Sequence, residues 1–467
     1  MKRLLLLLSI PFMINAQNKW DLKSCIDYAL KHNIQLQQGA VTREINKNNL
    51  DQTKAGALPS INLGASHTYN FGKTIDRFTN TFANARVLSQ NFFISSNVVL
   101  FSGLSQYNNI KSNEYAYLGS VENQKQLQNE ISLNVVNLYL NVIFTEELLG
   151  ISENQFKITE EQLSRTKVLV DAGSLAQSVQ YDLEAQLANE DVNVTNAKNN
   201  YAIAKLNLQQ AMNLDSVNEI AIEKPLFDIE AETGILYSVR QVYESALENQ
   251  PSIKASSYSL LSSEKSLAAS RGRRFPTISL NASLGTGTSE LAKNVTGFNI
   301  TGYDTTAITT GGQYVLSPQT EFITEKVPFA DQFKDNVNKS FGFTLSVPIF
   351  NGLQTHTSVK NAKLNLLNAK LNEDLAKQNL FKTIAQAHTG AVAALAKYKA
   401  NKKSVESSEI SFKFTEQKFN LGAISTLDYN TAKNRLLNAQ SNLLQSKYEY
   451  LLRVKILDFY MGKDLTF

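Results

Sequence analysis

The sequence predicts a mainly α-helical protein with a transmembrane β portion, in which duplicated long helical hairpins accompany four β-strands per chain. Three observations support this fold class. The chain is an internal duplication, long stretches of each copy follow a helical period, and the segments before those stretches alternate with the period of a strand. A duplication requires each copy to build the same supersecondary unit, which restricts the possible folds.

The duplication is visible in landmarks that return in the same order. Leu58-Pro59-Ser60 returns as Phe275-Pro276-Thr277 at an offset of 217 residues. Leu100-Phe101-Ser102-Gly103 returns as Ile349-Phe350-Asn351-Gly352 at an offset of 249, so the second copy holds 32 extra residues between its landmarks. We expect one repeat over 17–212, a linker over 213–236, a second repeat over 237–460 and a tail over 461–467.

Residues 1–16 have the features of a signal peptide. Lys2-Arg3 form a positively charged start, an apolar run follows, and Ala16 precedes the expected cleavage point. An N-terminal anchor helix is the alternative, but the apolar run is too short to span a bilayer core of ~30 Å. We therefore expect export. The single cysteine, Cys25, allows no internal disulfide and is expected to be a small core residue.

Composition argues against several function classes. Lys and Arg number 46 against 42 Asp and Glu, and a formal net charge of +4 is too balanced for a nucleic-acid-binding protein. There is no phosphate loop, nucleophile elbow or Cys pair, so we predict no enzyme activity and no cofactor. No metal site is predicted either, because the four histidines match no ligand spacing: His32, His67, His356 and His388.

Two proline-free segments, 104–170 and 353–419, are expected to be very long helices. At 1.5 Å per residue each would reach ~100 Å. From Ile131 to Phe156 the apolar and small residues step by four and three, which is a heptad seam, and the second copy repeats it. Each segment ends near a glycine, Gly173 or Gly422, so we predict two helical hairpins with glycine-containing tips.

Between the landmarks the period changes to two. Ile278, Leu280 and Ala282, for example, alternate with small polar residues. An apolar face opposite a small polar face is typical of a membrane β-barrel with a wet lumen, although an edge of a soluble sandwich would alternate in the same way. No segment after the leader resembles a transmembrane helix, so a membrane part would have to be a barrel. The strands are expected at about 60–70, 89–101, 277–286 and 339–350. The segments that join them, 71–88 and about 285–338, are expected as loops at the outer face of the barrel.

Four strands cannot close a barrel on their own. In lipid, an open edge leaves backbone groups unpaired at a cost of roughly several kcal/mol each. Two copies would give a narrow barrel filled by side chains, whereas three copies would give twelve strands and room for a lumen. The small inward residues favour three copies, hence a shared 12-stranded β-barrel.

Further motifs support a family resemblance. Trp20-Asp21-Leu22 opens the chain ahead of Cys25-Ile26 and Tyr28-Ala29-Leu30, and Ala172-Gly173-Ser174 precedes Glu184-Ala185-Gln186-Leu187. With the paired landmarks, the chain resembles the TolC-type outer-membrane efflux and secretion channels over about residues 20–465. The resemblance implies a homotrimer in the outer membrane of a Gram-negative bacterium, in which the helical hairpins form a trimeric α-barrel that continues the shared β-barrel through the periplasm. It also implies that an adaptor and an inner-membrane pump open the channel. It leaves open whether the cargo is a small molecule or a polypeptide of a type I secretion system.

Two aspartates near the tips are candidate pore residues. Asp428 lies six residues after Gly422 and matches a family carboxylate, and Asp182 lies nine residues after Gly173. In a trimer each would form a ring of three carboxylates that narrows the pore and favours cations. The alternative is that each stabilises a helix N-terminus. The resemblance also implies closing or adaptor contacts at the tips, for which the candidates are Gly173, Ser174, Phe419, Leu421, Gly422 and Ile424.

Other residues are candidates for the membrane interface. Arg271, Arg273 and Arg274 precede Pro276, where they would meet lipid headgroups or simply be solvated. Aromatic residues on the strands would form a girdle, or else ordinary strand packing: Tyr69, Phe341 and Phe343.

The predicted function is a passive exit duct across the periplasm and outer membrane. The alternative from a different class is a periplasmic coiled-coil scaffold without channel activity. Partners of the duct would be two further copies, an adaptor, a pump and outer-membrane lipid, with no nucleic acid.

Overall fold

The protein is described from a computed structural model, over residues 19–76, 79–84, 86–215, 220–225 and 237–465. The signal peptide expected over 1–16 lies outside these residues, as does much of the linker expected over 213–236. The chain forms two compact units, and each unit draws on both sequence copies. The helical unit holds the chain up to Lys47, Tyr115–Leu261 and the chain from Leu367 onward, and the strand unit holds Asn48–Glu114 and Ser262–Leu366.

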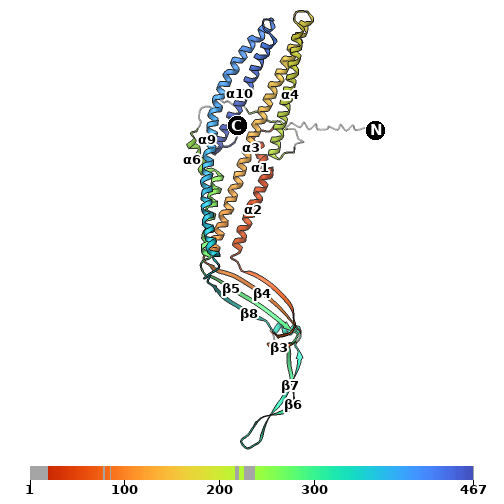
Figure 1. The fold of residues 1–467 in the computed structure, drawn as a ribbon, viewed down its shortest axis with the longest axis vertical. Coiled ribbons are helices and arrows are strands. Elements are labelled where there is room, and N and C mark those ends of the chain that lie inside the picture. Colours follow the sequence, from red (N-terminus) through yellow and green to blue (C-terminus); the bar gives the residue numbers. More distant parts are fainter. Residues whose placement is uncertain (1–18, 77–78, 85, 216–219, 226–236, 466–467) are drawn as a thin grey trace, which may run out of the picture. The chain divides into compact units, whose positions relative to one another are not determined.

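Two long helical hairpins dominate the chain (Figure 1). Helices α3 (Ser105–Asp171) and α9 (Gln354–Asn420) have 67 residues each, and they run back as α4 (Gln177–Met212) and α10 (Thr426–Tyr460). The predicted hairpins are therefore confirmed. The helices continue without a break because they contain no proline, and their isolated internal glycines weaken a helix by only about 1 kcal/mol each.

The heptad seams form the core of the helical unit. Val135 and Val142 of α3 are fully buried, as are Ile384 and Ala391 of α9. The described part of the linker packs on the same core: Ile222 bridges Trp20, and the Tyr139 hydroxyl donates to the Glu223 carbonyl at 2.6 Å. The described part of the linker therefore lies against the long helices.

Two pairs of shorter helices accompany the hairpins. Asp21 caps α1 through the Ser24 N–H, and a Ser238–Gln241 capping box opens α6. Cys25 is fully buried in α1, as predicted, and burial raises its thiol pKa to about 12. The helices are α1 (Leu22–His32), α2 (Ile34–Ala55), α6 (Val239–Asn249) and α7 (Pro251–Gly272).

One prediction about the helices is corrected. By length and composition, α3 contains a stretch long and apolar enough to cross a membrane, although no such stretch was expected after the leader. The physical reason is that the apolar seam of α3 contributes to the core of the helical unit, and 33% of the stretch is buried within the chain.

Four antiparallel strands form one sheet in the order β1-β4-β5-β8. The second copy departs from expectation at two points: β5 runs on to Ser289, and β8 ends at Ser346 instead of about 350. Pro348 explains the early end, because it has no N–H for the ladder. The strands are β1 (Ser60–Asn70), β4 (Val87–Ser102), β5 (Thr277–Ser289) and β8 (Asn338–Ser346).

The register gives this sheet one apolar and one polar face. Paired residues of antiparallel strands point to the same side, so Leu63, Ile94 and Leu284 share a face. Their neighbours Asn62, Ser95 and Ser283 share the other face. The predicted alternation is therefore confirmed, with Phe93 and Val99 of β4 as two apolar residues on the polar face.

The connections between strands are more ordered than a loop. A short hairpin, β2 (Lys73–Asp76) and β3 (Thr81–Asn84), separates β1 from β4. The segment expected as a long loop from about 285 to 338 instead holds a two-stranded ribbon and a short helix. These are β6 (Lys293–Ile308), β7 (Tyr314–Lys326) and α8 (Phe329–Asp335).

The repeated Phe-x-Gly landmark has a conformational cause. Gly103 and Leu104 both have positive φ, 61° each, and Gly352 and Leu353 repeat this pair at 61° and 65°. Two successive left-handed residues turn the chain from strand into helix, and glycine accepts this conformation without strain. At Gly103 a second constraint applies, because the backbone of Gly272 packs directly against it.

Candidate functional site

Both hairpin tips use the same backbone turn. Gly173 and Gly422 have φ of +73° and +70°. After each glycine a backbone N–H reaches back into the preceding helix: Ser174 N–H donates to the Leu169 carbonyl, and Ala423 N–H to the Lys418 carbonyl, both at 2.9 Å. This 6→1 bond with a left-handed glycine is the Schellman motif, which satisfies the last carbonyls of a helix.

The second tip is closed by a capping box. The Asp428 N–H donates to Ser425 Oγ at 3.2 Å, and the Asp428 carboxylate accepts from the Ser425 N–H at 3.4 Å and hydroxyl at 2.7 Å. Asp428 is the third residue of α10, where a carboxylate also favours the helix dipole. In a single chain, therefore, Asp428 has the helix-capping role, and its role as a pore ring stays a prediction.

The first tip lacks this cap. Ala176 occupies the N-cap of α4 and makes no side-chain hydrogen bond. Asp182 lies deeper in α4, at its sixth residue, and is exposed. The two candidate aspartates therefore sit in different local environments, although both lie near a tip.

The other tip candidates are half-buried or exposed. Phe419 stacks on Tyr429 at 4.6 Å between ring centroids, so it holds the hairpin together. Ile424 is half-buried, whereas Leu421 is 83% exposed. Leu427, which sequence reasoning missed, is 74% exposed. At the other tip the glycine and Ser174 are exposed, and Val168 adds an apolar side chain on the surface.

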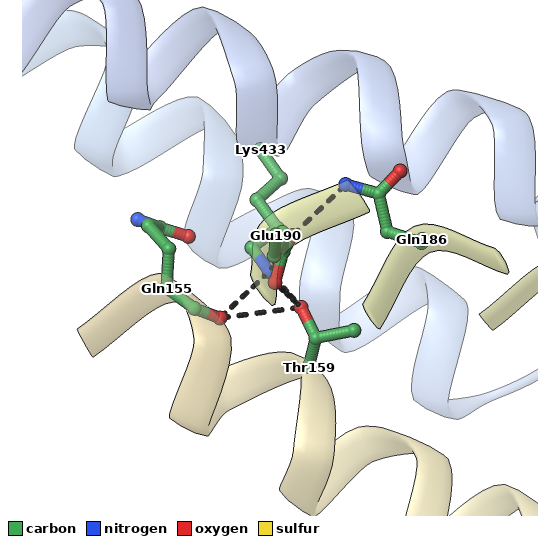
Figure 2. Close-up of polar contacts among 5 residues, drawn as sticks. All are labelled: Gln155, Thr159, Gln186, Glu190 and Lys433. Atoms are coloured by element: carbon green, nitrogen blue, oxygen red, sulfur yellow. Dashed lines mark hydrogen bonds and ion pairs between the residues drawn. The ribbon is translucent and has the colours of Figure 1, made fainter. Parts of the chain in front are cut away.

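A buried polar cluster links the two hairpins behind these tips (Figure 2). The Lys433 ammonium on α10 donates to Glu190 Oε1 on α4 at 2.9 Å and to the Gln155 carbonyl on α3 at 3.1 Å. Its third bond is to the Thr159 hydroxyl, which in turn donates to Glu190 Oε2. All three ammonium protons are thus used, as a buried lysine requires.

This cluster places opposite charges in the interior. The side chains of Lys433 and Glu190 are 2% and 8% exposed. Burial lowers the pKa of Lys433, and the contact with Glu190 opposes that shift. Sequence reasoning missed the cluster, because Lys433 lies outside the heptad seam, which passes through the neighbouring Ala432 and Leu436. The available signal was a lysine spaced four residues from Tyr429 and three from Leu436.

The polar face of the sheet forms a ladder of small side chains. The Asn97 amide donates to Asn281 Oδ1, and the Asn281 amide donates to Thr344 Oγ1 at 2.9 Å. Ser283 and Ser340 hydroxyls are bonded at 2.7 Å. An uncharged, hydrogen-bonding surface of this kind suits a water-filled lumen.

The interface candidates lie where the sequence placed them. Arg271, Arg273 and Arg274 are exposed where α7 ends and β5 begins. By register, the aromatic candidates belong to the apolar face of the sheet, where they are well exposed: Tyr69, Phe341 and Phe343. Their role at a membrane boundary stays a prediction. Within the described residues, no three His, Cys, Asp or Glu side chains are grouped to hold a metal.

The chain is similar to several outer-membrane proteins. It is 22% identical to the outer membrane efflux protein BepC of Brucella suis over 77% of this chain and 69% of BepC. It is 22% identical to the outer membrane protein TolC of Escherichia coli over 90% of this chain and 78% of TolC. The CmeC outer membrane channel of Campylobacter jejuni has the same fold, with a TM-score of 0.77 at 16% identity over 94% of this chain and 85% of CmeC.

The sequence profile of the outer membrane efflux protein family matches residues 25–214 and 242–463. That match covers both copies, with their hairpins and strands. The chain therefore belongs to the outer membrane efflux protein family and is an efflux channel of the Gram-negative outer membrane.

Proposed function

We propose that three copies of this chain close into one channel, with a twelve-stranded barrel in the outer membrane and a helical tunnel in the periplasm. The observation that carries the proposal is the open sheet. Among the described residues, β1 and β8 are edge strands, each paired on one side only. Their outer backbone groups would be unpaired in lipid at a cost of roughly several kcal/mol each, and pairing β1 of one copy with β8 of the next removes that cost.

The duct is passive and unselective in its barrel. Apart from apolar residues of β4 such as Phe93 and Val99, the polar face of the four strands offers amides and hydroxyls, and it carries no charged side chain. Energy and cargo choice then come from an inner-membrane pump and its adaptor, whether the cargo is a small molecule or a polypeptide. The tips are the surfaces for that contact, because Leu421, Leu427 and Val168 expose apolar area there.

Cysteine pairs at the two edges test the closure. We expect substitutions along β1 combined with substitutions along β8, such as Leu63→Cys with Phe343→Cys, to give disulfide-linked species up to a trimer in detergent extracts of the outer membrane. Cys25 is buried and does not compete.

A matched control uses the two central strands. Ser95 and Ser283 are direct partners on β4 and β5, so Ser95→Cys with Ser283→Cys should form a disulfide within one chain and no multimer. A soluble periplasmic chain that forms no edge-to-edge disulfide at any tested register would instead favour the coiled-coil scaffold.

A further inference from the structure

The β6–β7 ribbon contains a short repeat that the channel does not explain. Three five-residue units follow one another from β6 into the turn after it: Thr296-Gly297-Phe298-Asn299-Ile300, Thr301-Gly302-Tyr303-Asp304-Thr305 and Thr306-Ala307-Ile308-Thr309-Thr310. A β-bulge lies at the start of each unit, between Val295 and Gly297, Ile300 and Gly302, and Thr305 and Ala307. The repeat and the bulges therefore coincide.

Each bulge is built by a threonine. The hydroxyls of Thr296, Thr301 and Thr306 donate across the ribbon to backbone carbonyls of β7, at 3.3, 3.4 and 3.2 Å. A bulge leaves one residue unpaired and disrupts the ladder locally. Here the threonine hydroxyl restores a bond at that point, so the bulges are regular features of the ribbon.

The bulges decide which side chains share a face. Without them, a spacing of five would send Phe298 and Tyr303 to opposite sides. With one extra residue per unit, the register puts both on one side, together with their partners Phe322 and Pro318. The side chains of this apolar face that are well exposed, between 52% and 69%, are Val295, Phe298, Ile300, Tyr303, Ile308, Tyr314, Leu316 and Phe322.

The five charged residues of the ribbon are divided between the faces by sign. Lys293 and Lys326 are direct partners and lie on the apolar face at the base of the ribbon. The acidic residues lie on the opposite face: Asp304, Glu321 and Glu325. Two lysines placed directly opposite repel each other in water, so an anionic partner on that face would relieve the repulsion.

We propose that this ribbon lays its apolar face on the anionic lipid of the outer leaflet around the channel. The inference rests on the proposed channel, because the ribbon leaves β5 at the end away from α7 and so at the outer side of the membrane. Aromatic and aliphatic side chains bordered by lysines match the boundary of an anionic lipid surface. The acidic face then points to water.

A second copy fits this face less well. Under three-fold symmetry the ribbons start at one level, so packing apolar face on apolar face would bring their lysine pairs together. Edge pairing is also disfavoured, because Pro318 offers no N–H and bulges twist an edge away from a flat partner.

Two single-cysteine labels test the proposal in the full channel. Ile300→Cys reports the apolar face and Asn299→Cys its neighbour on the opposite face, each labelled with an environment-sensitive fluorophore. In vesicles of phosphatidylcholine and phosphatidylglycerol, we expect a blue shift and strong quenching by brominated lipid at Ile300→Cys and little of either at Asn299→Cys. Equal quenching at both positions would overturn the proposal.

Substitutions of the charged residues distinguish a lipid partner from a protein partner. Lys293→Gln with Lys326→Gln should lower the quenching at Ile300→Cys in these vesicles, because each lysine near an anionic surface contributes roughly fivefold to its attraction. Glu321→Gln with Glu325→Gln is the matched control and should not lower it. Ile300→Cys disulfides between copies, with no quenching by lipid, would show that the ribbons pack on one another and would also overturn the proposal.

Conductance of the same samples in planar bilayers tests the channel function independently of the ribbon. Intact conductance without lipid quenching would overturn the ribbon proposal alone. Absence of conductance in the unlabelled chain would overturn the proposed channel function.

Discussion

The two sequence copies share their backbone turns but differ in what those turns contact. At the strand-to-helix junction, Gly103 and Gly352 have the same φ, yet a Cβ on Gly103 would collide with the backbone of Gly272, whereas one on Gly352 would meet open space. The local sequence therefore sets the turn, whereas the packing of another segment of the same chain decides how strongly stability depends on the glycine.

The same contrast holds eleven residues beyond each tip glycine. In the first copy Glu184 is partly exposed and pairs with Lys167 of its own hairpin at 3.2 Å. In the second copy Lys433 is buried and reaches Glu190 of the other hairpin. The equivalent position therefore forms a surface ion pair within one hairpin in the first copy and a buried ion pair between the hairpins in the second copy.

The largest effect is expected at the junction. Gly103→Ala forces a Cβ against the Gly272 backbone and should destabilise the strand unit by more than about 3 kcal/mol. Gly352→Ala meets only the strain of its left-handed φ, about 1–2 kcal/mol. The measurement is the yield and thermal midpoint of the detergent-resistant channel. Equal damage at both glycines would break the comparison and indicate that a neighbouring copy packs on Gly352.

The next effect concerns the buried pair. Lys433→Met leaves Glu190 charged and buried without its cation, which should cost about 3–5 kcal/mol. Adding Glu190→Gln removes the isolated charge and should recover most of that loss. Glu184→Gln, at the equivalent position of the first copy, should leave the thermal midpoint of the helices unchanged. A single Lys433→Met with unchanged stability would contradict the structural importance of the cluster.

The pKa of Lys433 adds a pH dependence with a defined sign. Burial lowers this pKa in the folded chain below its usual 10.5, so the unfolded chain binds more protons in that interval. Stability therefore rises with pH there. As pH increases toward 10.5, the natural chain should gain thermal stability relative to Lys433→Met, measured by helical circular dichroism.

How far the sequence predicts this molecule depends on the range of the signal. Proline-free heptads located α3 and α9, and alternation located the four strands of the sheet, because both periods are local. The glycine tips and the sheet faces followed from the same local rules.

Sequence reasoning missed two features, the buried ion pair and the ribbon. The first has no local sequence pattern, and the second does not follow the period of a regular strand. Lys433 and Glu190 lie far apart in the chain, and nothing in either helix alone selects the partner. The ribbon was expected as a loop, because its bulges at Thr296, Thr301 and Thr306 break the period of two that identifies a strand. A five-residue repeat of threonine, a small residue and an apolar residue is the pattern that would have revealed it.

A smaller effect is expected at the tips. Ser425→Ala removes the hydroxyl of the capping box and should cost about 1 kcal/mol, whereas Ala176→Ser should supply a missing cap at the first tip and stabilise it by a similar amount. Amide hydrogen exchange in the first turns of α10 and α4 measures both. We expect faster exchange in α10 of Ser425→Ala and slower exchange in α4 of Ala176→Ser. Each substitution would then make the two tips more alike.

The smallest energetic effect carries the sharpest functional test. Asp428→Asn keeps an oxygen that accepts from Ser425 and removes the charge, so the helix should lose only about 0.3–1 kcal/mol of dipole interaction. If three copies place these carboxylates around the pore, cation selectivity in planar bilayers should fall. Asp182→Asn applies the same change to the first copy, deeper in its helix and outside a capping box. Unchanged selectivity in Asp428→Asn would leave capping as the whole role of this carboxylate, and a shift in Asp182→Asn alone would move the charged constriction to the first hairpin.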